Sequence, residues 1–357
     1  MTPVFALIAL QDDTPRTSSG LRPTSHRLPA PGQAGIGWSR PAASNDAGGV
    51  MRWRKLGVIF VPSSEPARAW MHSHAMVPTP FDMGDGRLRI YLSFRDAGNI
   101  SRVGFVDVDA ANPLRVLRVS ETPSLDIGEP GGFDDNGVLC TSVVRLDDGR
   151  LMMYYVGFEL STHIRYRLLT GAAISEDGEH FVRIKPTAIL ERSPAERYFR
   201  GGPFVMREQG IFRMWYVAGS SWLLLGGKQM PVYELRYLES EDGIHWPDQG
   251  ETVLATGPDE HGFGRPWVVK EDARYQLHYS ARKIALQSYR LGYAESADGI
   301  RWQRQDEQLG LDVSAEGWDS EAIMYSAVIR HGANEWLFYN GNNFGETGFG
   351  VALREPE

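Results

Sequence analysis

The chain has 357 residues, 42% of them hydrophobic, enough to bury the core of one large domain or two modest ones. A net charge of −8 without a long basic run argues against a nucleic-acid-binding surface, and no apolar stretch is long enough to span a membrane. One cysteine, Cys140, excludes an intrachain disulfide and favours a reducing, cytoplasmic location.

The first fifty residues lack the pattern of a folded segment. The apolar stretch "VFALIAL" has no Lys or Arg before it and is followed by Asp12 and Asp13, which makes it a poor signal peptide. From there to Val50 the chain is rich in Pro, Ser, Gly and Ala. We expect residues 1–50 to be a disordered extension and residues 51–357 to form one folded domain, with Met51 as an alternative start.

Five similar aromatic stretches follow one another toward the C-terminus. They are "RLRIYLSF", "RLMMYYVG", "IFRMWYVAG", "YQLHYSAR" and "EWLFYNGN", centred on Tyr91, Tyr154, Trp215, His278 and Phe338 at steps of 63, 61, 63 and 60 residues. A short apolar run precedes each stretch, and another apolar strand follows it. Units of about 60 residues with four short strands are typical of propeller blades. The sequence therefore predicts an all-β fold, a five-bladed β-propeller of four-stranded antiparallel blades.

The motif Ser-x-Asp-Gly-x-x-aromatic occurs three times, at residues 175–181, 240–246 and 296–302. Asp-Gly favours a turn, because glycine tolerates positive φ and aspartate accepts hydrogen bonds from nearby backbone. We predict that the motif is the turn between the third and fourth strands of a blade, with its aromatic packed between blades. A catalytic role for these aspartates is the less favoured alternative.

The last repeat ends one strand short. It reaches its third strand at "GFGVAL", after which the chain stops, whereas "KLGVIFVP" at residues 55–62 is a strand without a partner. Pairing the two segments would close the ring and cover an edge that otherwise invites aggregation. We therefore predict that residues 55–62 form the outer strand of the last blade.

Residues 53–355 resemble the five-bladed glycosidases of the clan that contains glycoside hydrolase families 32, 43, 62, 68 and 130. The resemblance lies in "DGRLMMYYVG", "GIFRMWYVAG", "GFGRPWVVKEDARYQLHYSAR", "LGYAESADGIRW" and "WDSEAIMYSAVIRHGANEWLFYNGNNFGETGFGVAL". It implies a site on the propeller axis, at the starting ends of the innermost strands. It also implies an Asp base or nucleophile on the first blade, a supporting Asp on the second and a Glu acid on the third.

This chain departs from that pattern at all three places. The first blade has Val77-Pro78, the second has Cys140-Thr141, and the third has Gly-Gly-Pro-Phe at residues 201–204. The hydrolytic roles of the family therefore cannot be carried over residue by residue.

Other ionisable or aromatic residues stand near the starts of the innermost strands, and we expect them to converge on one axial pocket. They are His72, His74, Asp134, Asp135, Arg200, His261, Arg265, Asp319, Glu321 and Tyr325. Glycosyl chemistry needs a paired acid and base. We assign Asp135 as base or nucleophile and Glu321 as acid, with His74 able to replace either in proton transfer. The others are predicted to bind substrate.

Several of these residues have structural alternatives. The two histidines could cap a strand end, and the two aspartates could form an Asx-turn. His72 and His74 with Asp135 or Glu321 could also ligate a metal, but no tight ligand motif supports this, so we predict no metal and no cofactor.

The remaining candidates would recognise a sugar. Arg200 and Arg265 offer planar forks for a carboxylate or phosphate. Trp267, Trp215 or Tyr325 could stack on a pyranose ring, and Asn340 and Asn342 could bind hydroxyls. The predicted function is a carbohydrate-active enzyme that cleaves or transfers a glycosyl group of a polar, anionic sugar or oligosaccharide. The alternatives are a non-catalytic carbohydrate-binding propeller and a glycoside phosphorylase that uses inorganic phosphate; the oligomeric state stays open.

Overall fold

The computed structural model describes residues 49–62, 68–164 and 166–356. The disorder predicted for residues 1–50 falls almost entirely outside these ranges. No helix among the described residues is both long and apolar enough to cross a membrane.

The fold is all-β and consists of curled sheets whose strands run in sequence order. The first four-stranded sheet contains β2 (Ser73–Asp82), β3 (Arg87–Arg95), β4 (Ser101–Asp109) and β5 (Val116–Val119). A second, twelve-stranded sheet contains three antiparallel groups in succession. They are β6 (Val138–Arg145), β7 (Leu151–Leu160), β8 (Tyr166–Ser175), β9 (Val182–Arg183); β10 (Arg200–Glu208), β11 (Ile211–Leu225), β12 (Lys228–Ser240), β13 (Glu251–Leu254); and β14 (Glu260–Glu271), β15 (Arg274–Lys283), β16 (Ser288–Ser296), β17 (Gln303–Arg304).

A third sheet joins the two ends of the described chain. It contains β18 (Met324–His331), β19 (Asn334–Asn340), β20 (Phe349–Arg354) and β1 (Trp53–Phe60). Two short 3₁₀ turns, η2 (Asp306–Leu309) and η3 (Asn342–Gly345), lie outside the strands. Strand β1 runs antiparallel to β20, from Trp53 opposite Arg354 to Phe60 opposite Phe349. The pairing predicted for residues 55–62 is therefore present, although the strand begins at Trp53 and ends at Phe60.

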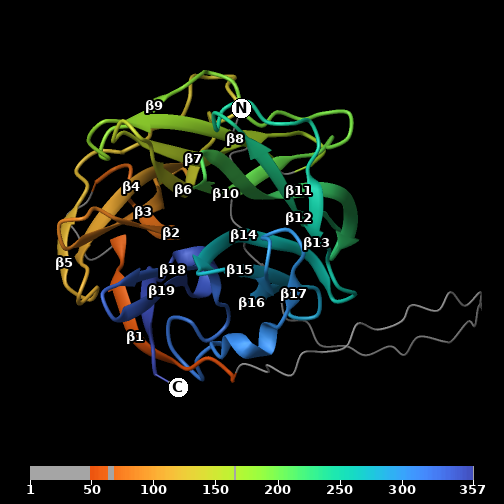
Figure 1. The fold of residues 1–357 in the computed structure, drawn as a ribbon. Coiled ribbons are helices and arrows are strands. Elements are labelled where there is room, and N and C mark those ends of the chain that lie inside the picture. The colour runs from red at the N-terminus through yellow and green to blue at the C-terminus, as the bar shows by residue number, and fades with distance from the viewer. Residues whose placement is uncertain (1–48, 63–67, 165, 357) are drawn as a thin grey trace, which may run out of the picture.

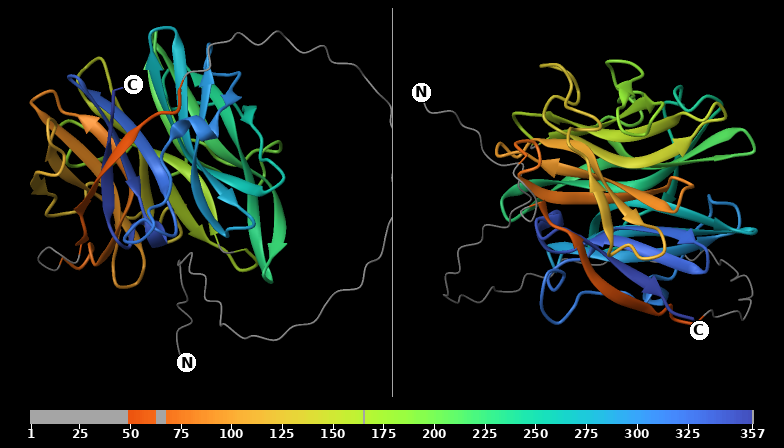
Figure 2. Two further views of the ribbon diagram at one scale, coloured as in Figure 1. Left: turned by 90° about the horizontal axis from the view of Figure 1, so that it is seen from below. Right: turned by 90° about the vertical axis from the view of Figure 1, so that its left-hand side faces the viewer.

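The sheets follow one another around a common centre (Figures 1 and 2). Parallel bridges between Arg200 and Leu169, and between Tyr233 and Gly262, connect the three groups of the twelve-stranded sheet. Each of the two four-stranded sheets is also one antiparallel group, which makes five groups in all. The first strand of each group contacts the first strand of the next: β2 with β6, β6 with β10, β10 with β14, β14 with β18, and β18 with β2. This closed series gives the protein a propeller-like architecture.

The three Ser-x-Asp-Gly motifs are turns after β8, β12 and β16, as predicted. In the second motif, Asp242 Oδ1 accepts the backbone N–H groups of Ile244 and His245, both at 2.8 Å. Gly243 has φ of 74° and its N–H donates to Ser240 Oγ at 3.0 Å. Glycine is required there because this left-handed conformation disfavours a side chain.

Each motif also contacts the group of strands that precedes its own group in the chain. The aromatic in the second strand of the preceding group donates to the carbonyl of the motif's glycine: Tyr91 to Gly178 at 2.6 Å, Tyr154 to Gly243 at 3.0 Å and Trp215 to Gly299 at 2.7 Å. The terminal aromatics Phe181, Trp246 and Trp302 pack edge-on against the same three rings. The predicted packing between neighbouring groups is observed.

His278 occupies the equivalent position on β15, facing the sheet that β1 completes. That sheet has no Ser-x-Asp-Gly turn, because its fourth strand comes from the other end of the chain. Both ring nitrogens of His278 are buried without a hydrogen-bond partner among the described residues. Burial lowers the pKa of His278 to about 3, with Arg354 adding to the effect.

Candidate functional site

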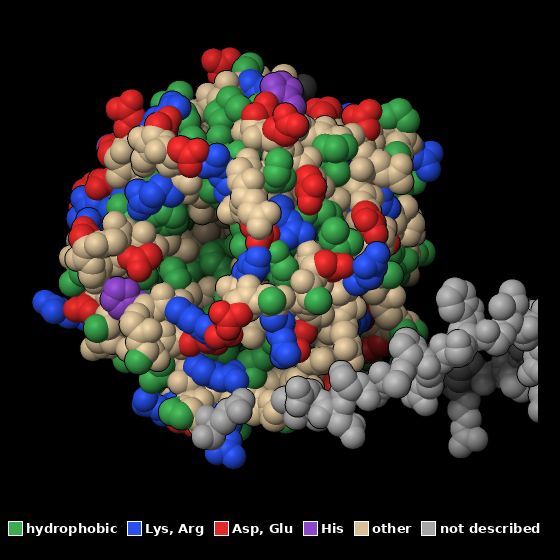
Figure 3. All heavy atoms as spheres, viewed as in Figure 1, with side chains coloured by type: hydrophobic (Ala, Val, Ile, Leu, Met, Phe, Trp, Pro, Cys, Tyr) green, Lys and Arg blue, Asp and Glu red, His purple; other side chains and the backbone are tan. Residues whose placement is uncertain are grey.

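A cavity of about 110 Å³ opens at the centre of the ring of first strands. Figure 3 shows this face of the molecule hollowed near its centre, with hydrophobic side chains at the base of the hollow. A third of the residues that line the cavity are aromatic: Phe158, Tyr166, Tyr233, Phe263, Tyr289, Tyr325 and Phe344. Its charged members are Arg95 and Arg265, and no Asp or Glu is found among the described residues that line it.

Every first strand has a bulge where it meets the cavity. The pairing register shifts between Met76 and Thr79, Cys140 and Ser142, Gly201 and Phe204, Gly264 and Trp267, and Met324 and Ala327. A bulge bends the strand and redirects a side chain. One residue from each bulge lines the cavity: Val77, Thr141, Gly202, Arg265 and Tyr325.

Two of these bulge residues have unusual backbone geometry. Val77 and Tyr325 both have φ of 56°, which is an outlier for a β-branched or aromatic residue. Such conformations persist only where their surroundings hold them, and they concentrate at functional sites. Asn340 holds the first bulge: its Oδ1 accepts the N–H of Val77 at 2.8 Å, and its Nδ2 donates to the carbonyl of Ala75 at 2.7 Å. Asn340 is therefore buried and bonded to backbone, and it does not line the cavity.

Arg265 lies at the axis and connects three first strands. Its Nη2 donates to the carbonyl of Pro78 at 2.6 Å and to Thr79 Oγ1 at 3.0 Å on β2, and its Nη1 donates to the carbonyl of Ser326 at 3.2 Å on β18. The guanidinium lies over the ring of Trp267, 4.6 Å from its centre. Burial lowers the pKa of Arg265 to about 9.

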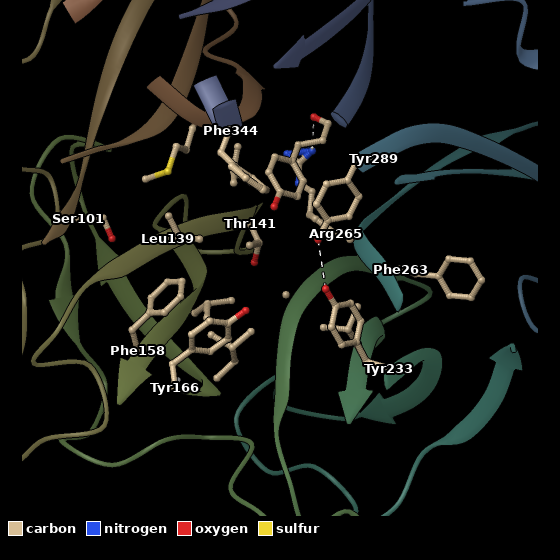
Figure 4. Close-up of a pocket in the computed structure, with 18 of the residues that line it drawn as sticks. Ser101, Leu139, Thr141, Phe158, Tyr166, Tyr233, Phe263, Arg265, Tyr289 and Phe344 are labelled. Atoms are coloured by element: carbon tan, nitrogen blue, oxygen red, sulfur yellow. Dashed lines mark hydrogen bonds between the residues drawn. The ribbon is translucent and has the colours of Figure 1, made fainter. Parts of the chain in front are cut away.

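A cluster of tyrosines forms the adjoining wall (Figure 4). Tyr233 and Tyr289 are hydrogen-bonded through their hydroxyl groups at 3.1 Å, and the ring of Tyr289 lies 5.7 Å from that of Tyr325. Burial raises the pKa of Tyr233 well above its usual value. These phenols are therefore neutral hydrogen-bonding groups at physiological pH.

His74 lies beside the cavity, on β2. Arg95, which lines the cavity, donates from Nη1 to His74 Nε2 at 3.3 Å. Burial, and secondarily the Arg95 charge, lowers the pKa of His74 to about 3. The imidazole is therefore neutral at physiological pH, while the neighbouring His72 is exposed to solvent.

Asp135 and Glu321 are not among the residues that line the cavity. Asp135 is partly buried and accepts hydrogen bonds from the N–H of Gly131 at 2.8 Å and from Asn136 Nδ2 at 2.6 Å; Asn136 itself lines the cavity. Glu321 is exposed, and its backbone N–H donates to Asn342 Oδ1 at 2.8 Å. The catalytic roles assigned to Asp135 and Glu321 stay predictions.

Three other predicted substrate ligands are held in buried ion pairs away from the cavity wall. Arg200 pairs with Glu196 at 2.5 Å, and Asp134 pairs with Arg183 at 2.8 Å. Asp319 pairs with Lys55 of β1 at 2.6 Å. In each case the charge of the predicted ligand is balanced by another side chain of the fold.

His261, Trp267 and Trp215 are also bonded to backbone within the fold. The Nδ1–H of His261 donates to the carbonyl of Pro231 at 3.0 Å, and burial lowers the pKa of His261. The indole N–H of Trp267 donates to the carbonyl of Val328 at 2.7 Å. Of the predicted site residues, Arg265 and Tyr325 are thus the two that line the cavity.

Metal ligation has no geometric support in the described part of the chain, where no group of three or more His, Cys, Asp or Glu side chains could hold an ion.

The bulge positions could have been found from the sequence. They lie 14, 13, 13, 13 and 13 residues before the five repeat centres, by subtraction. Three of them, Val77, Gly202 and Arg265, directly precede a proline. The sequence prediction relied instead on ionisable residues near the strand starts, and most of the residues it selected do not line the cavity.

The fold, a ring of antiparallel groups around an axial cavity, is similar to that of solved glycoside hydrolases. A solved "Glycoside hydrolase" aligns over 86% of this chain and 93% of its own, with a TM-score of 0.66 and 18% identity. A thermostable family-43 glycoside hydrolase aligns over 80% and 91%, with a TM-score of 0.59 and 17% identity. A GH32 beta-fructofuranosidase of Bombyx mori, solved as a mutant in complex with sucrose, aligns over 82% and 63%, with a TM-score of 0.55 and 14% identity.

The closer relationship is to two proteins of Mycobacterium tuberculosis. The uncharacterized protein Rv1502 of Mycobacterium tuberculosis (strain ATCC 25618 / H37Rv) is 37% identical over 306 residues, which are 85% of this chain and 100% of that protein. The uncharacterized protein MT1551 of strain CDC 1551 / Oshkosh matches to the same extent. The chain belongs to the family of these proteins, and no protein-family model matches it.

Proposed function

We propose that the chain is a carbohydrate-active enzyme built as a five-bladed propeller, which cleaves or transfers a glycosyl group bound in the axial cavity. The five blades would be the five antiparallel groups, with β1 as the outer strand of the last. The closed series of contacts among β2, β6, β10, β14 and β18 supports this count.

The observation that carries the proposal is the convergence of one bulge residue from every group on a single cavity. Backbone redirected by a bulge at five equivalent places, and strained at two of them, Val77 and Tyr325, is costly and supports a site rather than packing alone. Aromatic walls suit the apolar faces of a sugar ring, while tyrosine hydroxyls and an arginine suit its polar groups. The solved glycoside hydrolases with this fold support the same ligand class.

Cleavage needs an acid and a base. Asp135 and Glu321 remain our candidates, and Asp135 adjoins Asn136 of the cavity wall. A substrate that uses them would have to extend from the cavity to the loops that carry these carboxylates. His74 is a weaker candidate, since its Nε2 already accepts a hydrogen bond from Arg95.

The test is a screen of the wild-type protein against glycosides and oligosaccharides, with and without inorganic phosphate. If the assignment holds, Glu321→Gln and Asp135→Asn should each lower turnover about 10²–10⁴-fold while the melting temperature stays unchanged. Turnover that depends on phosphate would identify a phosphorylase. Full turnover in both variants would remove these carboxylates from the mechanism.

A second function is favoured by one observation, the lack of Asp and Glu among the described residues of the cavity wall. In a non-catalytic carbohydrate-binding propeller the cavity would hold a sugar without cleaving it. Calorimetric titration of the same panel separates the two functions. Binding without turnover across the panel would contradict the enzyme proposal and leave the binding function.

A further inference from the structure

We infer that the hairpin of β11 and β12 extends the candidate site into an apolar arm, residues 219–232, which holds a hydrocarbon chain attached to the sugar. The chain would be the aglycone of a glycoside. The inference rests on the proposed function for its sugar, which would lie in the cavity, but the arm stands on separate observations.

The arm projects beyond the rest of its group. Strand β11 pairs with β10 as far as Ala218, which lies opposite Arg200, the first residue of β10. From Gly219 to Leu225 it continues to pair with β12 but no longer with β10. At about 3.4 Å per residue this part of the strand is roughly 20 Å long. The arm therefore extends past the starting end of the innermost strand, which is the end where the cavity lies.

Both strands of the arm continue from the cavity wall. Val217 on β11 and Tyr233 on β12 line the cavity, and the arm lies between them in the chain. Tyr166, which lines the cavity beside Phe158 (Figure 4), also lines a small pocket at the arm together with Trp222. The cavity and the arm thus share a wall, and a ligand that leaves the cavity on this side meets the arm.

The arm is apolar where a hairpin in solvent is expected to be polar. Its sequence, GSSWLLLGGKQMPV, contains one charged residue, Lys228. Natural proteins protect exposed strand edges with charged side chains, whereas here Leu224 is 65% exposed. Packing accounts for Trp222, whose ring lies 6.1 Å from that of Tyr198 and 6.3 Å from that of Phe199. Packing does not account for Leu224.

Exposed leucines lie at this end of the ring in three consecutive groups. Leu160, Leu224 and Leu286 are 48%, 65% and 51% exposed, and each lies at the connection between the second and third strands of its group. The same connections of the other two groups carry Asn99 and Phe344, which line the cavity. Single exposed apolar side chains need no explanation, but apolar side chains that gather beside a cavity indicate a binding surface.

A hydrocarbon chain fits the arm better than a membrane or a second copy of the protein. A membrane-binding segment usually carries several Lys or Arg residues, whereas the arm has one and the whole chain has a net charge of −8. A stable interface between two copies takes about 20–30 residues a side, more than residues 219–232 provide. A chain bonded to a sugar in the cavity would instead begin at Val217 and Tyr233 and follow the arm outward.

The experiment measures the affinity of the whole protein for methyl, octyl and dodecyl β-D-glucopyranosides and β-D-galactopyranosides. Calorimetry is carried out below the critical micelle concentration of each. Burial of one methylene group tightens binding about fourfold at most, so the dodecyl glycosides should bind at least about a hundredfold more tightly than the methyl glycosides. This dependence on chain length reports on the arm, because the sugar is the same in each series.

The variant Leu224→Ser should weaken binding of the dodecyl glycosides about five- to twentyfold and leave binding of the methyl glycosides unchanged. Met230→Ser, at the pocket shared with Tyr166, should weaken binding of the octyl glycosides as well. The matched control is Leu117→Ser, since Leu117 is 42% exposed on β5, the outer strand of the first sheet. The control should bind every glycoside as the wild type does, and because Leu224 and Leu117 are both exposed, neither change should lower the melting temperature.

Equal affinity for the methyl and dodecyl glycosides would overturn the inference and leave the proposed function standing. So would a dependence on chain length that neither Leu224→Ser nor Met230→Ser reduces, because the chain would then lie elsewhere. Binding to phosphatidylcholine vesicles without any glycoside, lost in Leu224→Ser, would assign the arm to a membrane instead. A dimer in sedimentation that Leu224→Ser dissociates would assign it to a second copy.

The head group separates the inference from the proposed function. The ether of octanol with tetraethylene glycol has the same chain as the octyl glycosides but no sugar, and it should bind more weakly than they do. Equal binding of the ether and the glycosides would leave a chain site on the arm but remove the sugar, so that the proposed function fails. If no compound of either kind binds, both fail.

Discussion

Replacing Lys55 by methionine should destabilise the junction between the two ends of the described chain. Lys55 Nζ on β1 lies 2.6 Å from Asp319 Oδ2, and the Asp319 side chain is 2% exposed. Removing the lysine leaves that carboxylate with the hydroxyl of Tyr339 at 3.0 Å. Breaking a fully buried pair costs about 3–5 kcal/mol, and Lys55 is 24% exposed, so we expect a loss of about 2–3 kcal/mol.

The measurement is urea unfolding followed by tryptophan fluorescence, in a double-mutant cycle with Asp319→Asn. The ring of Trp318 lies 4.9 Å from that of Tyr339, which makes it a local reporter. The sum of the losses of unfolding free energy in the two single variants should exceed the loss in the double variant by about 1–2 kcal/mol, because each single change removes the same interaction.

The control is Arg54→Met on the same strand. The pair between Arg54 and Glu355 spans 3.5 Å, with both side chains more than two-fifths exposed, so its loss should cost less than about 1 kcal/mol. Strictly additive losses for Lys55 and Asp319 would refute the reasoning that this ion pair secures β1.

Three further outcomes follow from buried contacts. Asn340→Ala should lower the free energy of unfolding in urea by about 3 kcal/mol, since three buried hydrogen bonds disappear; unchanged stability would contradict its role in holding the Val77 bulge. Asp242→Ala should cost about 1–2 kcal/mol in thermal unfolding, because two backbone N–H groups lose their acceptor, whereas a neutral result would mean that water replaces it. His278→Phe should flatten the acid side of the stability profile. In the wild type the His278 side chain of the unfolded chain gains a proton below the ordinary histidine pKa of 6.5, while that of the folded chain does not until about pH 3. Stability therefore falls between these values by up to about 1.4 kcal/mol per pH unit, and an equally steep fall in the variant would exclude His278 as the cause.

The repeat and the strand order could be predicted because they depend on local patterns. Aromatic stretches at an even step, and Asp-Gly turns between them, specify strands and turns without reference to distant residues. The unpaired last repeat likewise pointed to β1, because a missing fourth strand must be supplied from somewhere. Only the limits of that strand differ: it begins at Trp53, which already pairs with Arg354, and it ends at Phe60.

The site was harder to predict because bulges shift which residue faces the axis. An ideal strand alternates its side chains, so Arg200 and Glu321 seemed as suitable as Arg265. Ion pairs also engage several of the predicted ligands. The partner of Arg200, Glu196, lies only four residues away and could have been predicted, whereas the partner of Asp319, Lys55, lies 264 residues away and could not. Long-range ion pairs leave no periodic signal in one sequence.

The pairing of β1 with β20 also constrains how the chain can be made in a cell. Gly57 lies opposite Val351, so one strand of the sheet emerges from the ribosome 294 residues before its partner. At about 5–20 residues per second, β1 waits roughly 15–60 seconds with an open edge. Its end carries Phe60, which in the folded chain is buried in one cluster with Phe338 and Phe349 of the C-terminal strands. Newly made chains are therefore exposed to strand-to-strand association throughout synthesis, and the folded ring cannot form until translation is nearly complete.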